Sequence, residues 1–264
     1  MQKKGIKILV TNDDGYNSKG IKVLSELLAA YGDVTVMAPA EPHSGMSAAL
    51  SLENILRTKK ISEYKVGEHT VSFHSLTGTP ADCVKLAMNT LFSIEDKPDL
   101  LVAGINHGSN ASVASVYSGT LGATMEGTIY GVPSIGVSLD AHSPDADFSG
   151  VKKYLPHILE QYFKCKPAEN VYLNINFPDI APEEIKGIRM ARQGNGMWIK
   201  EFERREDPHG REYFWMTGYF MDKETSCGNA DHRFLAQGYI TIVPHSVDTT
   251  DYTELKRLEK EWKL

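Results

Sequence analysis

The sequence of 264 residues predicts an α/β fold in which a mostly parallel sheet carries helices on both faces. Short apolar runs alternate along the chain with segments of helical periodicity, and this alternation is typical of right-handed βαβ units. Glycine, proline and capping residues separate the two kinds of segment. Between residues 186 and 237 the pattern changes to dense charges and clustered aromatic residues, which predicts a β-rich, protruding arm. We therefore expect a single domain over 1–264, with 1–185 and 238–264 as the α/β core and 186–237 as the arm.

Strands and helices are expected to alternate through most of the chain. The expected strands cover residues 6–10, 34–38, 99–104, 132–137, 171–175 and 239–243, and a looser β segment covers 57–74. The expected helices cover residues 21–31, 80–91, 119–130 and 151–163, and a last helix through Leu255, Leu258 and Trp262 is expected to return to the core. Thr79, Pro80 and Asp82 have the spacing of a helix start: a cap residue, a proline at the first position and an acid three residues after the cap.

Composition and charge exclude several classes of protein. With 41% hydrophobic and 23% charged residues, the chain lies in the ordinary globular range and can bury a sizeable core. Its 28 basic and 34 acidic residues give a net charge of −6 without a long run of either sign. Neither duplex nucleic acid nor a membrane is therefore an expected partner, and an anionic substrate must be bound by local contacts.

Cysteine content and hydrophobic runs predict where the protein acts. The three cysteines, Cys83, Cys165 and Cys227, are widely spaced and form neither a CxxC pair nor a disulfide framework. The apolar run after the basic start MQKKG is too short for the core of a signal peptide. No stretch approaches the roughly 18 apolar residues that a membrane span needs. We therefore expect a cytoplasmic protein.

The stretch TNDDGY at residues 11–16 follows the first expected strand and places two carboxylates side by side. Ligands of open α/β sheets bind at the carboxyl ends of the strands, which is where Asp13 and Asp14 are expected. Two adjacent carboxylates raise each other's pKa unless a cation neutralises them, and a hard divalent ion is the usual solution. The alternative is a pair of helix-capping acids in a polar loop.

Two further strand ends carry polar residues. Ser44 and Gly45 lie in a loop after the second expected strand. Asn106 closely follows the apolar run that begins at residue 99, and Gly108 and Asn110 shape the turn behind it. Asn106 could bind a ligand or could close the strand through backbone hydrogen bonds.

The segment YSGT places Ser118, Gly119 and Thr120 at the start of an expected helix. Free backbone N–H groups there form either an anion site or an ordinary capped terminus. The sequence therefore predicts a hard metal ion beside a phosphate site. The evidence is two acids, a hydroxyl and an amide at three strand ends, together with this helix start.

These segments resemble the SurE family, the survival protein E nucleotidases. The matching motifs are ILVTNDDG at 8–15, AP…HSG at 38–45, GTPADCV at 78–84, GINHGSN at 104–110 and YSGTLGATMEG at 117–127. They stand in the order and spacing of the family over roughly the first 140 residues. The stretch AQGYITIVP near the C-terminus resembles the family's closing strand.

The resemblance implies a Rossmann-like core and metal-dependent hydrolysis of phosphate monoesters, chiefly nucleoside 5′-monophosphates. Activity on 3′-nucleotides and on short polyphosphate would be extensions of the same chemistry. One divalent ion per subunit, Mg²⁺ or Mn²⁺, is implied, with ligands at the positions Asp13, Asp14, Ser44 and Asn106. The resemblance also implies that the arm is a protruding C-terminal β-hairpin exchanged between subunits, in a homodimer or a homotetramer. The alternative for the arm is that Trp198 and Trp215 pack only within it.

The mechanism that follows is a hypothesis in which metal-bound water attacks phosphorus in line. Asp13, Asp14 and Asn106 are the expected catalytic residues, because they would hold the ion and orient the water. The expected donors to the phosphate and substrate are Asn12, Gly45, Gly108, Asn110, Ser118, Gly119 and Thr120. His107 could act as a general acid, although an exposed loop histidine is the simpler interpretation.

Two rival functions remain open at this point. One is a phosphatase that forms an aspartyl-phosphate on Asp13, although its acids are adjacent here and not alternate. The other is a nucleotide-binding or metal-sensing module without turnover. The chain also departs from the family pattern at Ser112, where a glycine is common, and at His43. These departures bear on substrate preference more than on catalysis.

Overall fold

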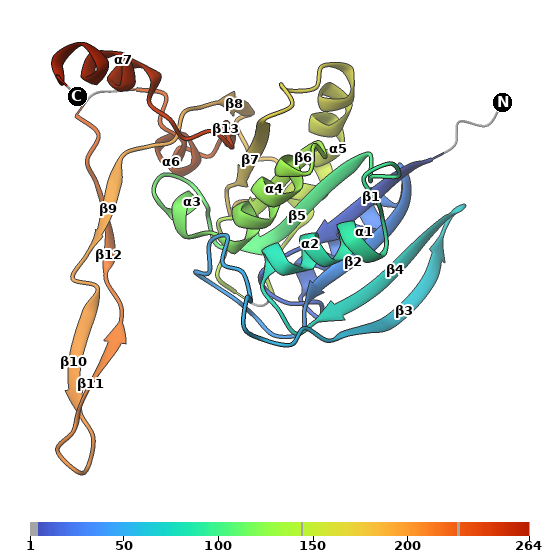
Figure 1. The fold of residues 1–264 in the computed structure, drawn as a ribbon, viewed down its shortest axis with the longest axis horizontal. Coiled ribbons are helices and arrows are strands. Elements are labelled where there is room, and N and C mark those ends of the chain that lie inside the picture. Colours follow the sequence, from blue (N-terminus) through green and yellow to red (C-terminus); the bar gives the residue numbers. More distant parts are fainter. Residues whose placement is uncertain (1–4, 144, 226–227, 264) are drawn as a thin grey trace.

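The computed structural model describes residues 5–143, 145–225 and 228–263, and its centre is one nine-stranded sheet (Figure 1). The strand order is β3-β4-β2-β1-β5-β6-β7-β13-β8. The strands from β4 to β7 run parallel, while β3 pairs antiparallel with β4, and β13 pairs antiparallel with β7. The strands are β1 (Ile6–Thr11), β2 (Gly32–Pro39), β3 (Thr58–Val66), β4 (His69–Leu76), β5 (Leu100–His107), β6 (Ser134–Leu139), β7 (Val171–Phe177), β8 (Ile188–Met190) and β13 (Ile240–Ser246).

Helices cover both faces of the sheet and enclose two apolar layers. On one face lie α1 (Lys19–Leu28) and α5 (Ser149–Lys164), and on the other lie α2 (Pro80–Thr90) and α4 (Gly119–Ile129). Alternate side chains of β1 enter opposite layers, because successive residues of a strand point to opposite faces. Ile8 and Val10 pack with α1 and α5, whereas Leu9 packs with α2 and α4. The predicted fold class is confirmed.

The strand order reverses between β1 and β5. From β1 the chain proceeds to β2 on one side, and β5 lies on the other side of β1. Open α/β sheets bind ligands at the carboxyl ends of strands at such a reversal of strand order. Asp13 and Asp14 follow β1 there, and Asn106 and His107 end β5. The register of β5 against β6 shifts between Ala103 and Asn106, so the end of β5 is irregular where Asn106 lies.

Several elements differ in extent from the prediction. The looser β segment is a hairpin, β3 and β4, that turns at Gly67 with φ +59° and joins the main sheet at its edge. β5 continues to His107, so that Asn106 lies within the strand and not in the loop after it. A short helix, α3 (Ala114–Tyr117), precedes α4 and was not predicted.

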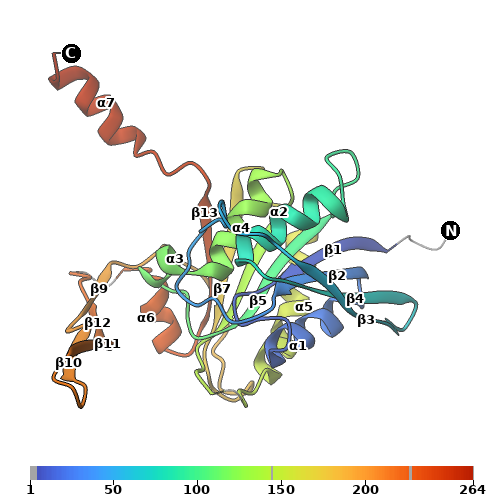
Figure 2. The ribbon, with the colours of Figure 1, turned by 60° about the horizontal axis from the view of Figure 1, so that its bottom comes forward.

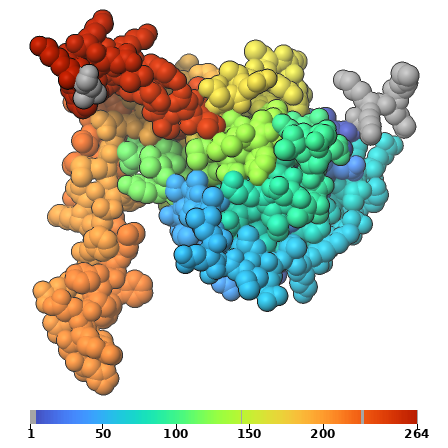
Figure 3. Space-filling view, viewed as in Figure 1, coloured from blue at the N-terminus to red at the C-terminus, as the bar shows by residue number. Residues whose placement is uncertain are grey.

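The arm is a thin β structure that stands away from the body (Figures 1 and 3). It consists of β9 (Gly196–Ile199) paired with β12 (Tyr219–Asp222) at its root, and β10 (Phe202–Glu206) paired with β11 (Glu212–Met216) at its tip. The protruding part is shorter than the predicted 186–237. The reason is that β8 joins the main sheet through β13, and α6 (Asp231–Ala236) packs against β13.

The C-terminal helix forms but does not return to the core. Figure 2 shows α7 (Tyr252–Glu261) projecting from the end of β13. None of its residues is buried, and Tyr252, Leu255 and Trp262 remain exposed. The expectation that this helix packs on the core was therefore wrong, because helical periodicity specifies an apolar face but not the surface that covers it.

No described helix is long and apolar enough to cross a membrane. Cys83 is buried and Cys165 is exposed, and both are free thiols, while Cys227 lies outside the described residues.

The start of α2 is a complete capping box, as predicted from its spacing. Asp82 N–H donates to Thr79 Oγ1 at 3.1 Å, and Thr79 N–H donates to Asp82 Oδ2 at 2.9 Å. The same two side chains also bind a loop from earlier in the chain. Thr79 Oγ1 donates to the Ala49 carbonyl, and Asp82 Oδ1 accepts from Ser51 N–H. The box therefore fixes both the helix and residues 49–51.

Thr79→Ala removes the cap and the bond to Ala49 together. We expect it to lower the free energy of unfolding by about 1–2 kcal/mol, since loss of a threonine N-cap typically costs that much. Thr90→Ala is a matched control near the other end of α2, where the exposed hydroxyl bonds only to the Leu86 carbonyl. Urea unfolding of both variants checks the prediction, and equal stability of the two variants would contradict it.

Candidate active site

Asp13 is the most buried of the predicted metal ligands, with 5% of its surface exposed. Thr120 Oγ1 donates to its Oδ1 at 2.6 Å. A Cβ at Gly119 would lie 3.0 Å from Asp13 Cβ, so only a glycine lets the start of α4 come this close. Burial raises the pKa of Asp13 to about 6; the Thr120 hydroxyl opposes this rise and the Asp14 charge adds to it.

Asp14, which follows β1, is paired with His107 at the end of β5. Its Oδ2 accepts from the His107 backbone N–H and lies at the same distance, 3.1 Å, from His107 Nδ1. The histidine ring is 16% exposed and meets Phe148 edge-on at 5.4 Å between centroids. The interpretation of His107 as an exposed loop histidine is therefore wrong. The sequence did not reveal this pairing, because Asp14 and His107 are 93 positions apart.

Asn106 is buried at the end of β5. Its amide nitrogen donates to the Gly108 carbonyl at 2.7 Å. Gly108 has φ +102°, a left-handed conformation that favours glycine. This bond fixes the orientation of the amide and leaves Oδ1 as the end available to a cation.

Ser44 and Gly45 lie on an exposed loop that is anchored on both sides. On one side, His43 N–H donates to the Asp13 carbonyl at 2.7 Å. On the other side, Ser47 N–H donates to the Tyr117 carbonyl at 3.0 Å. The loop therefore spans from Asp13 to the YSGT segment, and both predicted loop residues are exposed between these anchors.

A buried amide network, which was not predicted from the sequence, lies behind the GINHGSN segment. Asn176 Oδ1 accepts from Asn110 N–H at 2.7 Å, and Asn174 Nδ2 donates to the Asn110 carbonyl at 2.9 Å. The Asn110 side chain donates to Ser138 Oγ at 2.8 Å. Asn174 and Asn176 are fully buried on β7. Two asparagines at alternate positions of the apolar strand VYLNINF were the signal that could have revealed them.

Other residues predicted to bind phosphate support the site from within. Asn12 Nδ2 donates to the Gly15 carbonyl and to Ser18 Oγ, both at 2.9 Å, which closes the turn after β1. Ser118 Oγ caps α4 by accepting from Leu121 N–H at 3.1 Å. Direct phosphate contacts by Asn12, Gly45, Gly108, Asn110, Ser118, Gly119 and Thr120 stay a prediction.

The donor set suits a hard cation. Among the described residues, no group of three or more His, Cys, Asp and Glu side chains could hold a metal ion. An ion between β1 and β5 would therefore need amide and hydroxyl oxygens beside the two carboxylates. Oxygen ligands of this kind are those that Mg²⁺, Mn²⁺ and Ca²⁺ prefer. Asn12 Oδ1 and Thr11 Oγ1 are also buried at this edge without a hydrogen-bond partner in the part of the chain that the structure describes.

The chain is similar to members of one family along its whole length. The family model described as Survival protein SurE matches residues 8–200. A protein of Phocaeicola vulgatus named 5′-nucleotidase SurE is 42% identical over 264 residues, which are 100% of this chain and 99% of that protein. A protein of the same name from Christiangramia forsetii is also 42% identical, with the same coverage of both chains.

A solved structure supports the same relationship. The crystal structure of the SurE protein from Aquifex aeolicus matches with a TM-score of 0.81 at 34% identity, over 96% of this chain and 98% of that one. Because the family model covers most of the chain and full-length relatives match it from end to end, the chain belongs to the survival protein SurE family.

Proposed function

We propose that this protein is a divalent-metal-dependent 5′-nucleotidase that hydrolyses nucleoside monophosphates to nucleoside and phosphate. The observation that carries the proposal is the contact of Asp14 with His107, the neighbour of Asn106, at the reversal of strand order between β1 and β5, where the buried Asp13 also follows β1. The names of the curated relatives, 5′-nucleotidase SurE, support the same activity. Nucleoside 3′-monophosphates and short polyphosphate are further candidate substrates of the same site.

The proposed metal ligands are Asp13, Asp14, Ser44 and Asn106, and we propose Mg²⁺ or Mn²⁺, one ion per chain. The fit rests on the donor set, because two carboxylates, an amide oxygen and a hydroxyl match a hard cation. Such an ion supplies Lewis acidity: it neutralises phosphate charge and lowers the pKa of a coordinated water.

The chain's own residues hold and orient the reactants. Asp14 is the more exposed of the two carboxylates, and we assign to it the orientation of the attacking water. His107 fixes the Asp14 carboxylate through two contacts at 3.1 Å. Gly45 at φ +73° has open space beside its Cα, so its backbone can approach a phosphate oxygen closely.

The burial of Asp13 disfavours the rival mechanism through an aspartyl-phosphate. A nucleophilic carboxylate must reach phosphorus in line, but Asp13 is 5% exposed and its Oδ1 accepts a bond from Thr120. The other rival is a module that binds nucleotides without hydrolysing them. Release of phosphate from a nucleotide by the protein would exclude that rival.

We also propose that the arm assembles two or more copies of the chain into a homodimer or homotetramer. On one face of the tip, Phe202 pairs with Met216, and Phe214 lies beside them on β11. All three are more than half exposed, and an isolated two-stranded hairpin is marginally stable in water. An exposed apolar face of this kind is typical of a protein interface. A cytoplasmic location, expected from the cysteines, stays a prediction.

Asp13→Asn tests the metal site. We expect the rate of phosphate release from nucleoside 5′-monophosphates in Mg²⁺ or Mn²⁺ to fall by about 100-fold or more. Loss of a residue that only supports a metal ligand typically costs about 10–100-fold, and loss of a ligand itself should cost more. The wild type should lose activity equally in EDTA. Asp179→Asn, at an exposed carboxylate, is the matched control and should keep full activity. Undiminished release by Asp13→Asn would overturn the assignment.

Asn176→Ala tests the buried amide network. The Asn110 N–H would lose its acceptor, so the GINHGSN segment should shift, and we expect kcat/KM to fall by about 10–100-fold, as for outer-shell residues of metal sites. Asn170→Ala is the control, because that amide is exposed and makes only a 3.4 Å bond to Ser246. Steady-state kinetics on samples whose folding is verified by circular dichroism decides the matter, and equal kinetics for both variants would refute the role.

Phe214→Glu tests the arm interface. Placing a charge on the apolar face of the tip should lower the assembly state, which sedimentation velocity measures directly. Glu203→Lys, on the opposite face of the same hairpin, should leave the assembly intact. A monomeric wild type, or an unchanged assembly in Phe214→Glu, would argue against an interface at this face.

A further inference from the structure

A cavity of about 310 Å³ lies between the GINHGSN segment, the root of the arm and α6. This volume is at the lower end of the roughly 300–1,000 Å³ range of small-molecule sites. Trp198 from β9 and Phe220 from β12 form an aromatic wall, with their ring centroids 6.2 Å apart and their planes at 72°. Ser109, Asp140 and His142 supply polar groups at the lining.

The cavity is continuous with the loop that carries the candidate active site. His142 packs against Gly108, where an added Cβ would lie 3.0 Å from His142 Cε1. The Gly108 carbonyl in turn accepts the bond from Asn106. Asp140 and His142 follow β6, at the same carboxyl edge of the sheet as β1 and β5. One turn of backbone therefore separates the cavity from the proposed phosphate site.

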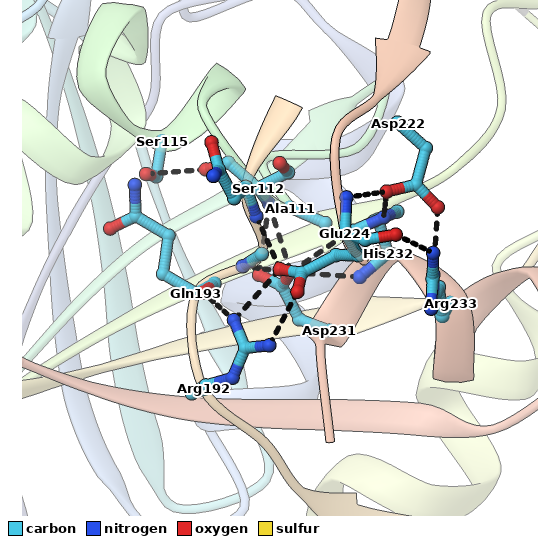
Figure 4. Close-up of polar contacts among 12 residues, drawn as sticks. Ala111, Ser112, Ser115, Arg192, Gln193, Asp222, Glu224, Asp231, His232 and Arg233 are labelled. Atoms are coloured by element: carbon cyan, nitrogen blue, oxygen red, sulfur yellow. Dashed lines mark hydrogen bonds and ion pairs between the residues drawn. The ribbon is translucent and has the colours of Figure 1, made fainter. Parts of the chain in front are cut away.

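A buried carboxylate holds the walls of this cavity together (Figure 4). Asp231, which is fully buried at the start of α6, accepts bonds from Ser112 N–H at 3.0 Å and from Gly194 N–H at 2.9 Å. It thus ties the loop after GINHGSN to the root of the arm. Ser112 has φ +55° there, the left-handed conformation that favours glycine, so the bond also holds a strained residue in place.

The far side of the cavity is fixed in the same way. Asp222, at the end of β12, lies 3.3 Å from His232 Nε2 and 2.7 Å from Arg233 Nε (Figure 4). The Phe220 ring meets the His232 ring edge-on at 5.3 Å. The aromatic wall is therefore anchored to α6, and the cavity has a defined shape and is not a chance gap beside a loose arm.

We propose that this cavity binds the base of the nucleoside monophosphate, with Trp198 as the residue that determines preference for substrates that carry a base. The inference rests on the proposed function, because a phosphate bound between β1 and β5 would place the rest of the substrate along the GINHGSN segment. A heteroaromatic base presents flat faces that stack on indole and phenyl rings, and its polar edge matches hydroxyl, carboxylate and imidazole groups. Trp198 is 39% exposed, so part of its surface is free for such a contact.

The test compares a substrate that has a base with one that lacks it. Phosphate release from adenosine 5′-monophosphate and from ribose 5-phosphate is measured for the wild type, Trp198→Ala, Trp198→Phe and Trp215→Ala. Trp215 is a matched control, because it is a 58% exposed tryptophan on the tip of the same arm and does not line the cavity. Saturation-transfer NMR with adenosine alone reports on the cavity without turnover.

We expect Trp198→Ala to raise KM for adenosine 5′-monophosphate on the order of tenfold, as is usual for loss of a base-stacking ring, with kcat nearly unchanged. Ribose 5-phosphate kinetics should not change, Trp198→Phe should stay close to the wild type, and Trp215→Ala should behave as the wild type. An equal loss on both substrates, an effect shared with Trp215→Ala, or no change in KM would overturn the inference.

The proposed function and the proposed base site can be refuted independently of each other. If the wild type releases no phosphate from any nucleotide, the proposed function is lost, and adenosine NMR then decides the cavity alone. An adenosine signal that Trp198→Ala abolishes would support the cavity, and a signal that is absent or independent of Trp198 would refute it. If nucleotides are hydrolysed no better than ribose 5-phosphate, the nucleotidase remains a phosphomonoesterase and the base site is wrong.

Discussion

The buried Asp13 carboxylate is the constraint around which the rest of the site is arranged. A carboxylate at the carboxyl end of a buried strand needs either donors or a cation, because desolvation disfavours its charge. The Thr120 hydroxyl donates to this carboxylate, and Gly119 lets the start of α4 approach closely enough for that bond. The Asp13 carbonyl also anchors the loop that carries Ser44 through His43. Residues from three separate segments are thus positioned relative to one charged group, which the divalent cation proposed above would neutralise.

Behind the residues around Asp13, buried polar side chains occupy positions on β7 and α6 that are usually apolar. Asn174 and Asn176 hold the backbone on both sides of Asn110, and Asp231 holds Ser112 two residues further on. Each of these bonds satisfies a backbone group that would otherwise be buried without a partner. The segment from Asn106 to Ser112 is therefore held by hydrogen bonds at both of its ends, so one loop connects the residues near Asp13 with the cavity. In this account, the chemistry near Asp13 and the selection of substrate near Trp198 depend on a common support.

The sequence predicted what local pattern determines and missed what tertiary contacts determine. The capping box at Thr79 and Asp82 and the buried strand β1 followed from local sequence pattern. The pairing of Asp14 with His107 did not, because it joins residues at the ends of two strands that are far apart in the sequence. The amphipathic C-terminal helix was predicted correctly as a helix and incorrectly as part of the core. Family motifs pointed to Ser44 and Asn106, but only the structure shows that the side chains of Asn12, Asn110 and Ser118 are engaged within the protein.

The most direct test of the central claim is a crystal structure of the protein with Mn²⁺, in which anomalous scattering locates the ion independently of the atomic coordinates of its ligands. We expect one strong anomalous peak per chain, surrounded by Asp13, Asp14, Asn106 and Ser44, and no peak there in Asp13→Asn. A peak elsewhere in the chain, or none at saturating Mn²⁺, would contradict the assignment of a metal centre to the carboxyl ends of β1 and β5.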